Sequence, residues 1–240
     1  MKPSYFFLTS LLILSTFNSC KVGRFAVYNF AGIKDYKIFP SRMIETGSTH
    51  FYFDITVQGK APKDLFINGQ NYPFESYLED NNTVAFLIIQ NDTIQFEKYW
   101  QNYNEASIVP SFSMAKSITS ILIGCAIDDG LIESVNEPVT NYIPELKENG
   151  FDKVSIANVL QMTSGIKFNE SYYNPFGDAA TFYYGRNLRK AVEKMKLERA
   201  PGKEFQYDSG NTQILGLVLE RALKDKSISA YLQEKIWEPL

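Results

Sequence analysis

One apolar stretch constrains the fold more than any other part of the chain. Residues 111–132 read SFSMAKSITSILIGCAIDDGLI, and the segment from Met114 to Ile127 leaves hardly any polar face on a helix. Pro110 before it and Gly130 after it are typical of a helix start and a helix stop. We therefore expect a helix over 111–129 that is buried on nearly all sides. A chain of 240 residues, 45% of them hydrophobic, can build the one sizeable core that this requires.

Two reactive side chains lie in the first turn of this expected helix. The backbone N–H of Ser113 has no intrahelical partner there, and the positive end of the helix dipole is close. An anion forming on an acyl group bound to Ser113 would meet this free donor, which is half of an oxyanion hole. Lys116 follows on the same helix face, where apolar neighbours would exclude water and favour a neutral amine that can accept the serine proton. The pattern S-x-x-K therefore predicts a nucleophilic serine and its activating lysine.

The S-x-x-K spacing alone does not decide this interpretation. It also occurs at Ser164 and Lys167, but Ser164 belongs to a Thr-Ser-Gly turn, where no buried helix can carry Lys167 to it. The alternative for Ser113 is an ordinary serine at a helix start, with Lys116 extending outward into water. Spacing and helix context leave the two interpretations of Ser113 equal.

A tyrosine later in the chain supplies a third candidate group. The stretch PGKEFQYDSGNTQILGLVLERAL places Tyr207 in a loop just before a helix that is apolar along one face. A phenol held on such a loop can pass a proton between a serine and a leaving group. Taken alone, Tyr207 is better explained as a packing residue, since the chain has 15 tyrosines. We interpret the neighbouring Asp208 as a loop residue rather than as a catalytic acid.

The rest of the pattern predicts a hairpin followed by a mainly helical region. TVAFLIIQ and TIQFEKYW flank Asn91-Asp92, which indicates a strand, a tight turn and a strand. The region from Lys21 to Phe74 lacks sustained periodicity, and we expect ordered structure to begin near Thr83. Helices are expected at 111–129, 155–161, 187–197, 212–223 and 227–237.

Charge and residue counts argue against several kinds of function. The formal net charge is -3 and no run of basic residues appears, so nucleic acid is not an expected partner. One histidine and two cysteines cannot assemble the usual zinc clusters or a disulfide framework, and we expect no metal and no cofactor. His50 precedes the hairpin without a G-x-S-x-G elbow, so a Ser-His-Asp site is not expected. We interpret Cys125 as a core thiol.

The N-terminus has the character of an export signal. Lys2 precedes an apolar stretch from Tyr5 to Phe17 that is too short to span a bilayer. Ser19-Cys20 resembles the lipobox of bacterial lipoproteins, which implies a lipid anchor on Cys20 and a place in the periplasm or cell envelope, attached to a membrane. The alternative is an ordinary secretory signal with an incidental cysteine. We expect a signal peptide at 1–20, an extension packing on the domain at 21–75, and the main domain at 76–240.

Taken together, six blocks of the chain resemble one known superfamily. The blocks are AFLIIQNDTIQFEKYW, SFSMAKSITSILIGCAIDDGLI, NEPVTNYIPEL, VSIANVLQMTSGI, APGKEFQYDSGNTQILGLVLE and YLQEKIWEPL. They resemble, in order, the serine hydrolases of the β-lactamase and penicillin-binding-protein superfamily, in the branch of class C β-lactamases, esterases and 6-aminohexanoate-dimer hydrolases. The resemblance implies an α/β fold, with an antiparallel sheet flanked by helices and a helical domain. It also implies acylation of Ser113, proton removal assisted by Lys116, and Tyr207 as general base and acid.

Two departures from the superfamily pattern shape the expected function. Ser209 stands where Y-x-N has its asparagine, as in the esterase and amide-hydrolase relatives, so a β-lactam substrate is disfavoured and Ser209 becomes a substrate-binding candidate. The third motif, K-T-G or H-x-G, appears nowhere after Tyr207, so we expect these residues to be the front part of a longer protein. The leading hypothesis is an ester or amide hydrolase acting on a small-molecule or peptide-like substrate. The alternatives are a D,D-carboxypeptidase or β-lactamase, and a non-catalytic binding or sensor lipoprotein.

Overall fold

The computed structural model describes residues 21–28, 30–48, 50–56, 59 and 61–240. The signal peptide expected at 1–20 and its Cys20 lie outside these residues. Among the described residues, no helix combines the length and the apolar character needed to cross a membrane. The described chain forms two compact units, one from residues up to 45 together with 111–239, and the other from 46–110 with Leu240. The boundaries expected at 20/21 and 75/76 stay predictions.

The 46–110 unit contains two small sheets and one helix. In the larger sheet the order is β1 (Asp54–Ile55), β5 (Thr93–Tyr99) and β4 (Ala85–Gln90), with β4 antiparallel and β1 parallel to β5. The expected hairpin is confirmed, and its turn residues Asn91 and Asp92 both have positive φ, as a tight hairpin turn requires. The smaller sheet pairs β2 (Asp64–Ile67) with β3 (Gln70–Pro73), and α3 (Phe74–Asp80) follows.

Ordered structure therefore begins well before Thr83, contrary to the sequence prediction. The strands β1 to β3 have only two to four residues each, which is too short for alternation to be recognised. β1 owes its pairing to β5, which lies far along the chain. Phe74, Leu78 and Trp100 form the small core of this unit.

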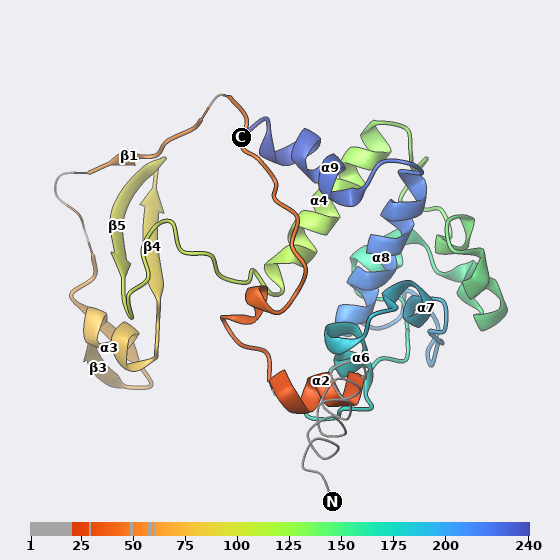
Figure 1. The fold of residues 1–240 in the computed structure, drawn as a ribbon, viewed down its shortest axis with the longest axis horizontal. Coiled ribbons are helices and arrows are strands. Elements are labelled where there is room, and N and C mark those ends of the chain that lie inside the picture. The colour runs from red at the N-terminus through yellow and green to blue at the C-terminus, as the bar shows by residue number, and fades with distance from the viewer. Residues whose placement is uncertain (1–20, 29, 49, 57–58, 60) are drawn as a thin grey trace, which may run out of the picture. The chain divides into compact units, whose positions relative to one another are not determined.

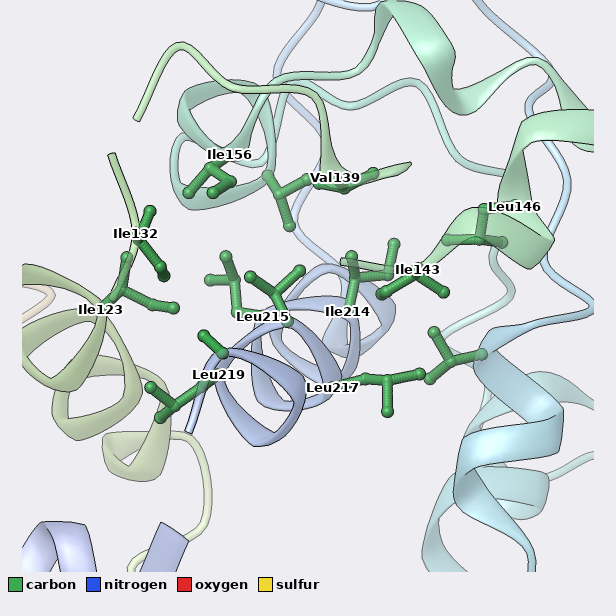
Figure 2. Close-up of a cluster of buried hydrophobic side chains, with 14 of the residues drawn as sticks. Ile123, Ile132, Val139, Ile143, Leu146, Ile156, Ile214, Leu215, Leu217 and Leu219 are labelled. Atoms are coloured by element: carbon green, nitrogen blue, oxygen red, sulfur yellow. The ribbon is translucent and has the colours of Figure 1, made fainter. Parts of the chain in front are cut away.

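The other unit is helical and is built around α8 (Ser209–Ala222). Three helices pack against α8: α4 (Met114–Asp128), α5 (Ile156–Leu160) and α7 (Leu188–Val192) (Figure 1). Their apolar side chains form the main core, in which Ile123 of α4 faces Leu215 and Leu219 of α8 (Figure 2). Short 3-10 turns at Val139–Asn141, Pro144–Asn149 and Phe151–Lys153 add further buried side chains.

Three more helices and a π turn near the C-terminus belong to the described part of this unit. α6 (Asp178–Tyr184) packs against α2 (Lys21–Tyr28), which is followed by a 3-10 turn at Asp35–Lys37 (Figure 1). Near the C-terminus, α9 (Ile228–Leu232) continues into a π turn at Gln233–Trp237. α7 ends at Val192, five residues before the end expected from sequence, and the chain then pairs Leu197 with Ile166 in an isolated bridge.

The burial expected for α4 is wrong in extent. Only Leu122, Ile123 and Ala126 of this helix are buried, while Ile121 is 52% exposed and Met114 is 73% exposed. Helix composition shows that no face is polar, but it cannot show how many faces find a packing partner. Among the described residues, α4 packs mainly along one side, against α8.

Candidate active site

The candidate nucleophile lies at the start of α4 after a strained residue. Phe112 has φ +44, a left-handed conformation that costs a non-glycine residue about 1–3 kcal/mol. Ser113 is the N-cap of α4, and its carbonyl oxygen accepts from the backbone N–H of Lys116 at 3.0 Å. The hydrogen bonds between described residues give the backbone N–H of Ser113 no partner. This N–H is therefore free to donate to a developing oxyanion, as the sequence predicts.

Three predicted residues converge on one oxygen atom. Lys116 Nζ donates a hydrogen bond to Ser113 Oγ at 3.2 Å, and the phenol of Tyr207 donates to the same Oγ at 2.8 Å. Lys116 Nζ also donates to Ser209 Oγ at 3.1 Å and lies 5.3 Å from the centroid of the Tyr207 ring. The structure therefore brings together Ser113, Lys116, Tyr207 and Ser209, all from the helical unit. Their catalytic and substrate-binding roles stay predictions.

Glu170 joins this group, and sequence reasoning missed it. Its carboxylate accepts from Ser209 Oγ at 2.6 Å and from the backbone N–H of Ser209 at 2.8 Å. The second bond places a negative charge at the positive end of the α8 dipole. The phenol of Tyr172 donates to the same carboxylate at 3.1 Å. Glu170 lies in the tyrosine-rich loop FNESYYN, and no local spacing in that loop indicates a partner 39 residues away.

The carboxylate of Glu170 also affects its neighbours electrostatically. Burial, then the charge of Glu170, raises the pKa of Tyr172 above its ordinary value. Ser209 links Glu170 to Lys116, because the Ser209 hydroxyl donates a hydrogen bond to the Glu170 carboxylate and accepts one from Lys116 Nζ. The ammonium of Lys116 thus has a carboxylate one hydroxyl away rather than in direct contact.

Asp208 caps α8 from inside the protein. Its carboxylate is 2% exposed and accepts from the backbone N–H and the side-chain amide of Asn211, each at 2.9 Å. Burial is the largest effect and raises the pKa of Asp208 to about 6, although the hydrogen bonds from Asn211 act in the opposite direction. Since Asp208 stands between Tyr207 and Ser209, this cap fixes the backbone that carries both. Asp208 thus lies in the loop expected from sequence, at its last position, where it caps the helix that follows.

The second S-x-x-K match takes no part in this site. Ser164 is 1% exposed and donates to the side-chain oxygen of Asn211 at 2.5 Å, so it belongs to the buried network under the α8 cap. Lys167 is exposed, and its backbone N–H bonds to the carbonyl oxygen of Lys196. The two S-x-x-K matches therefore lie in different environments: Ser113 is at the start of α4 beside Lys116, and Ser164 is in a buried turn under α8.

Other candidates are not members of the converged group. His50 belongs to the 46–110 unit. Cys125 is a free, half-buried thiol that packs against the main core. Within the described part of the chain, no group of three or more His, Cys, Asp or Glu side chains is arranged to hold a metal ion.

A cavity of about 610 Å³ opens beside the nucleophile. Ser113, Lys116 and Ser209 line it, together with Phe112, Tyr172 and other largely apolar side chains. A separate hollow of about 720 Å³ lies in the 46–110 unit and contains none of the converged residues. The arrangement in the helical unit has the parts that acyl transfer needs: a serine oxygen, two groups that can exchange its proton, a free backbone donor and a pocket.

Comparison with known proteins identifies the family. The family model described as Beta-lactamase matches residues 74–240, which is more than half of the chain. The chain belongs to the Beta-lactamase family. The superfamily resemblance and the fold expected from the six sequence blocks are thereby confirmed.

Two of the similar proteins have hydrolase names. The chain is 30% identical over 176 residues to the 6-aminohexanoate-dimer hydrolase of Paenarthrobacter ureafaciens, covering 69% of this chain and 44% of that protein. A structure assigned as a 6-aminohexanoate-dimer hydrolase from Bacillus anthracis superposes with a TM-score of 0.66 at 21% identity, covering 81% of this chain and 54% of that one. FmtA from Staphylococcus aureus has a TM-score of 0.53 at 22% identity, covering 69% and 47%. The chain thus spans about half the length of these relatives.

Proposed function

We propose that the protein is a serine hydrolase that cleaves an ester or amide bond through an acyl-enzyme on Ser113. The observation that carries the proposal is the convergence of Lys116 Nζ and the Tyr207 phenol on Ser113 Oγ, at 3.2 and 2.8 Å. Membership of the family supports it, and so does the 30% identity to a 6-aminohexanoate-dimer hydrolase, whose name describes amide hydrolysis.

The proposed reaction follows from the hydrogen bonds around Ser113. Ser113 Oγ accepts from both Lys116 and Tyr207, so one of these two groups must give up a proton before it can take the serine proton. Ser113 Oγ then attacks the carbonyl carbon, and the free N–H of Ser113 donates to the oxyanion. The bond to the leaving group breaks as Tyr207 passes a proton to it. Water next attacks the acyl-enzyme, which releases the carboxylic acid and restores the serine.

Ser209 favours an ester or amide substrate over a β-lactam. Its hydroxyl accepts from Lys116 and donates to Glu170, so both of its polar functions are engaged within the protein. No side-chain amide is offered at this position, where the asparagine of Y-x-N contacts β-lactams in the superfamily. A D,D-carboxypeptidase or β-lactamase activity, or a non-catalytic role, would appear as a different outcome of the same experiment.

The test is labelling of the full-length protein by a fluorophosphonate probe, whose phosphorus is attacked by the nucleophilic serine with loss of fluoride, and the labelled peptide is located by mass spectrometry. We expect the label on Ser113, and we expect Ser113→Ala to abolish it. Tyr207→Phe should slow labelling roughly 100-fold, because one proton-transfer group is lost while the ring is kept. Ser120→Ala is the matched control, since Ser120 is an exposed serine on the same helix, and it should label normally.

Turnover of a small panel then separates the hypotheses. We expect hydrolysis of a p-nitrophenyl ester and of a linear hexanoyl amide, and none of a chromogenic cephalosporin or a D-Ala-D-Ala peptide. A label on Ser164 or on any serine other than Ser113 would refute the mechanism. The absence of any label on the folded full-length protein would favour the non-catalytic alternative.

A further inference from the structure

The described residues before 46 lie outside the family match but share a compact unit with the candidate site. The family model begins at residue 74, whereas the segment 21–45 clusters with residues 111–239. The family assignment therefore gives this segment no role. A role can instead be inferred from the position of the segment in the fold.

Several specific contacts hold the segment 21–45 against α6. Lys21 Nζ donates to Thr181 Oγ1 at 2.8 Å, at one end of the contact. Further along, the Tyr183 phenol donates to the carboxylate of Asp35 at 2.7 Å, and Phe39 packs edge-on against the same Tyr183 ring at 5.5 Å. Polar contacts between charged or hydroxyl groups and edge-on aromatic pairs fix direction as well as distance. The segment is thus held in one position on α6.

This position brings the segment to the wall of the cavity beside Ser113. Phe30 and Ala31 line the cavity together with residues of α4, α6 and α8. The Phe30 ring packs edge-on against Tyr173 at 5.5 Å and remains 49% exposed. Phe30 also has φ +67, a conformation that is unfavourable for a bulky residue and must be maintained by its surroundings.

The chemistry of the cavity wall indicates what the cavity accepts. Its lining includes the aromatic residues Phe30, Phe112, Tyr172, Tyr173, Phe182 and Tyr183. Lys116, already engaged with Ser113 and Ser209, is the one charged side chain in the described lining. Away from Lys116, a charged substituent on a substrate would therefore lose water here without gaining an oppositely charged partner. The volume of about 610 Å³ lies within the range that holds a medium-sized organic group.

The position of Tyr207 indicates which part of the substrate enters. Tyr207 contacts Ser113 Oγ but does not line the cavity. In the proposed reaction Tyr207 passes a proton to the leaving group, so the leaving group departs on the Tyr207 side. The cavity, with Lys116 and Ser209, then receives the acyl side of the scissile bond.

We propose that residues 21–45 form a wall of an acyl-binding pocket, and that Phe30 and Ala31 select uncharged, apolar acyl groups. This inference rests on the proposed function, because it assigns the substrate class of the same site. It adds a specificity-determining segment that the catalytic group itself does not require.

The test is a series of p-nitrophenyl esters from acetate to decanoate, with the succinate monoester as a charged counterpart, hydrolysed by the full-length protein. The wild type should prefer medium-chain esters over both acetate and succinate. Phe30→Ala should lower the ratio of kcat/KM for octanoate to that for acetate about tenfold, because acyl methylenes lose their contact. Val27→Ala is the matched control: Val27 is an exposed apolar residue of the same segment that does not line the cavity, and this variant should keep the wild-type ratio.

A second variant keeps the proposal testable if Phe30→Ala does not fold. Ala31 is exposed, so Ala31→Lys should be tolerated and should place an ammonium on the cavity wall. We expect it to lower the octanoate rate and to raise the succinate rate relative to acetate. Unchanged chain-length ratios in both variants, or an equal change in Val27→Ala, would overturn the proposal while leaving acetate hydrolysis as evidence for the proposed function. If Ser113 is not acylated even by the acetate ester, the proposed function fails and this inference fails with it.

Discussion

The buried carboxylate of Asp208 should make one part of the folding stability decrease as pH rises. Its pKa is raised from 3.8 to about 6, so the folded state holds this proton more tightly than the unfolded state does. The favourable contribution is fully present below pH 3.8 and is lost as pH rises through about 6. A difference of about two pKa units corresponds to roughly 3 kcal/mol at most, since one unit is about 1.4 kcal/mol.

Asp208→Asn isolates this contribution from all other titrating groups. Asparagine is a good N-cap. If the side-chain amide of Asn211 rotates by half a turn, its oxygen can accept from the new asparagine amide at position 208, and its NH2 group can donate to the hydroxyl of Ser164. The variant cannot ionise at position 208. Its free energy of unfolding relative to the wild type should therefore improve between pH 4 and pH 7.5, by up to about 3 kcal/mol.

Urea unfolding followed by circular dichroism, repeated across this pH range, measures the difference directly. Asp225→Asn, which removes one exposed carboxylate, is measured alongside as the control. A wild-type advantage that stays constant or grows with pH would refute the reasoning. It would mean that the hydrogen bonds from Asn211 outweigh the cost of burying the charge.

Two further predictions concern the α4 core and the N-terminus. Ile123→Ala should lower the free energy of unfolding by about 2–5 kcal/mol, because Ile123 is fully buried. Ile121→Ala on the same helix should lower it far less, because Ile121 is 52% exposed. Equal decreases in denaturant unfolding of the two variants would contradict the packing described for α4. Metabolic labelling with a fatty acid in a bacterial host should mark the wild type and not Cys20→Ala, because Ser19-Cys20 resembles a lipobox; equal labelling of both would exclude the lipid anchor.

Local sequence patterns correctly predicted those features whose physical causes are local. The helix after Pro110 places Ser113 and Lys116 three residues apart on one face, and their polar atoms lie 3.2 Å apart. Asn91 and Asp92 tolerate positive φ, which is what the hairpin turn between β4 and β5 needs. Both outcomes depend on backbone geometry over a few residues, so residue type and spacing are sufficient to predict them.

Residues far apart in sequence acquired their roles only through tertiary packing. Tyr207 reaches Ser113 across 94 residues, and only the resemblance to a superfamily suggested this pairing. Glu170 reaches Ser209 across 39 residues, and nothing in its loop predicted it. The strands before Thr83 were missed because each has only two to four residues, and β1 in addition pairs with the distant β5.

By itself, the sequence determined the family, the helix that carries Ser113 and Lys116, and the hairpin, because periodicity, turn chemistry and ordered motifs are properties of short stretches. Tertiary structure decided that Ser209 is held by Glu170, that Asp208 is a buried cap, and that Phe30 stands on the wall of the cavity. These contacts join residues that are distant in the sequence, so they depend on how the helices and loops pack against one another. The apolar sequence of α4 predicts that the helix buries part of its surface. Which element it packs against, which of its faces is buried and how much of its surface is covered are determined only by the packing of α8 against it.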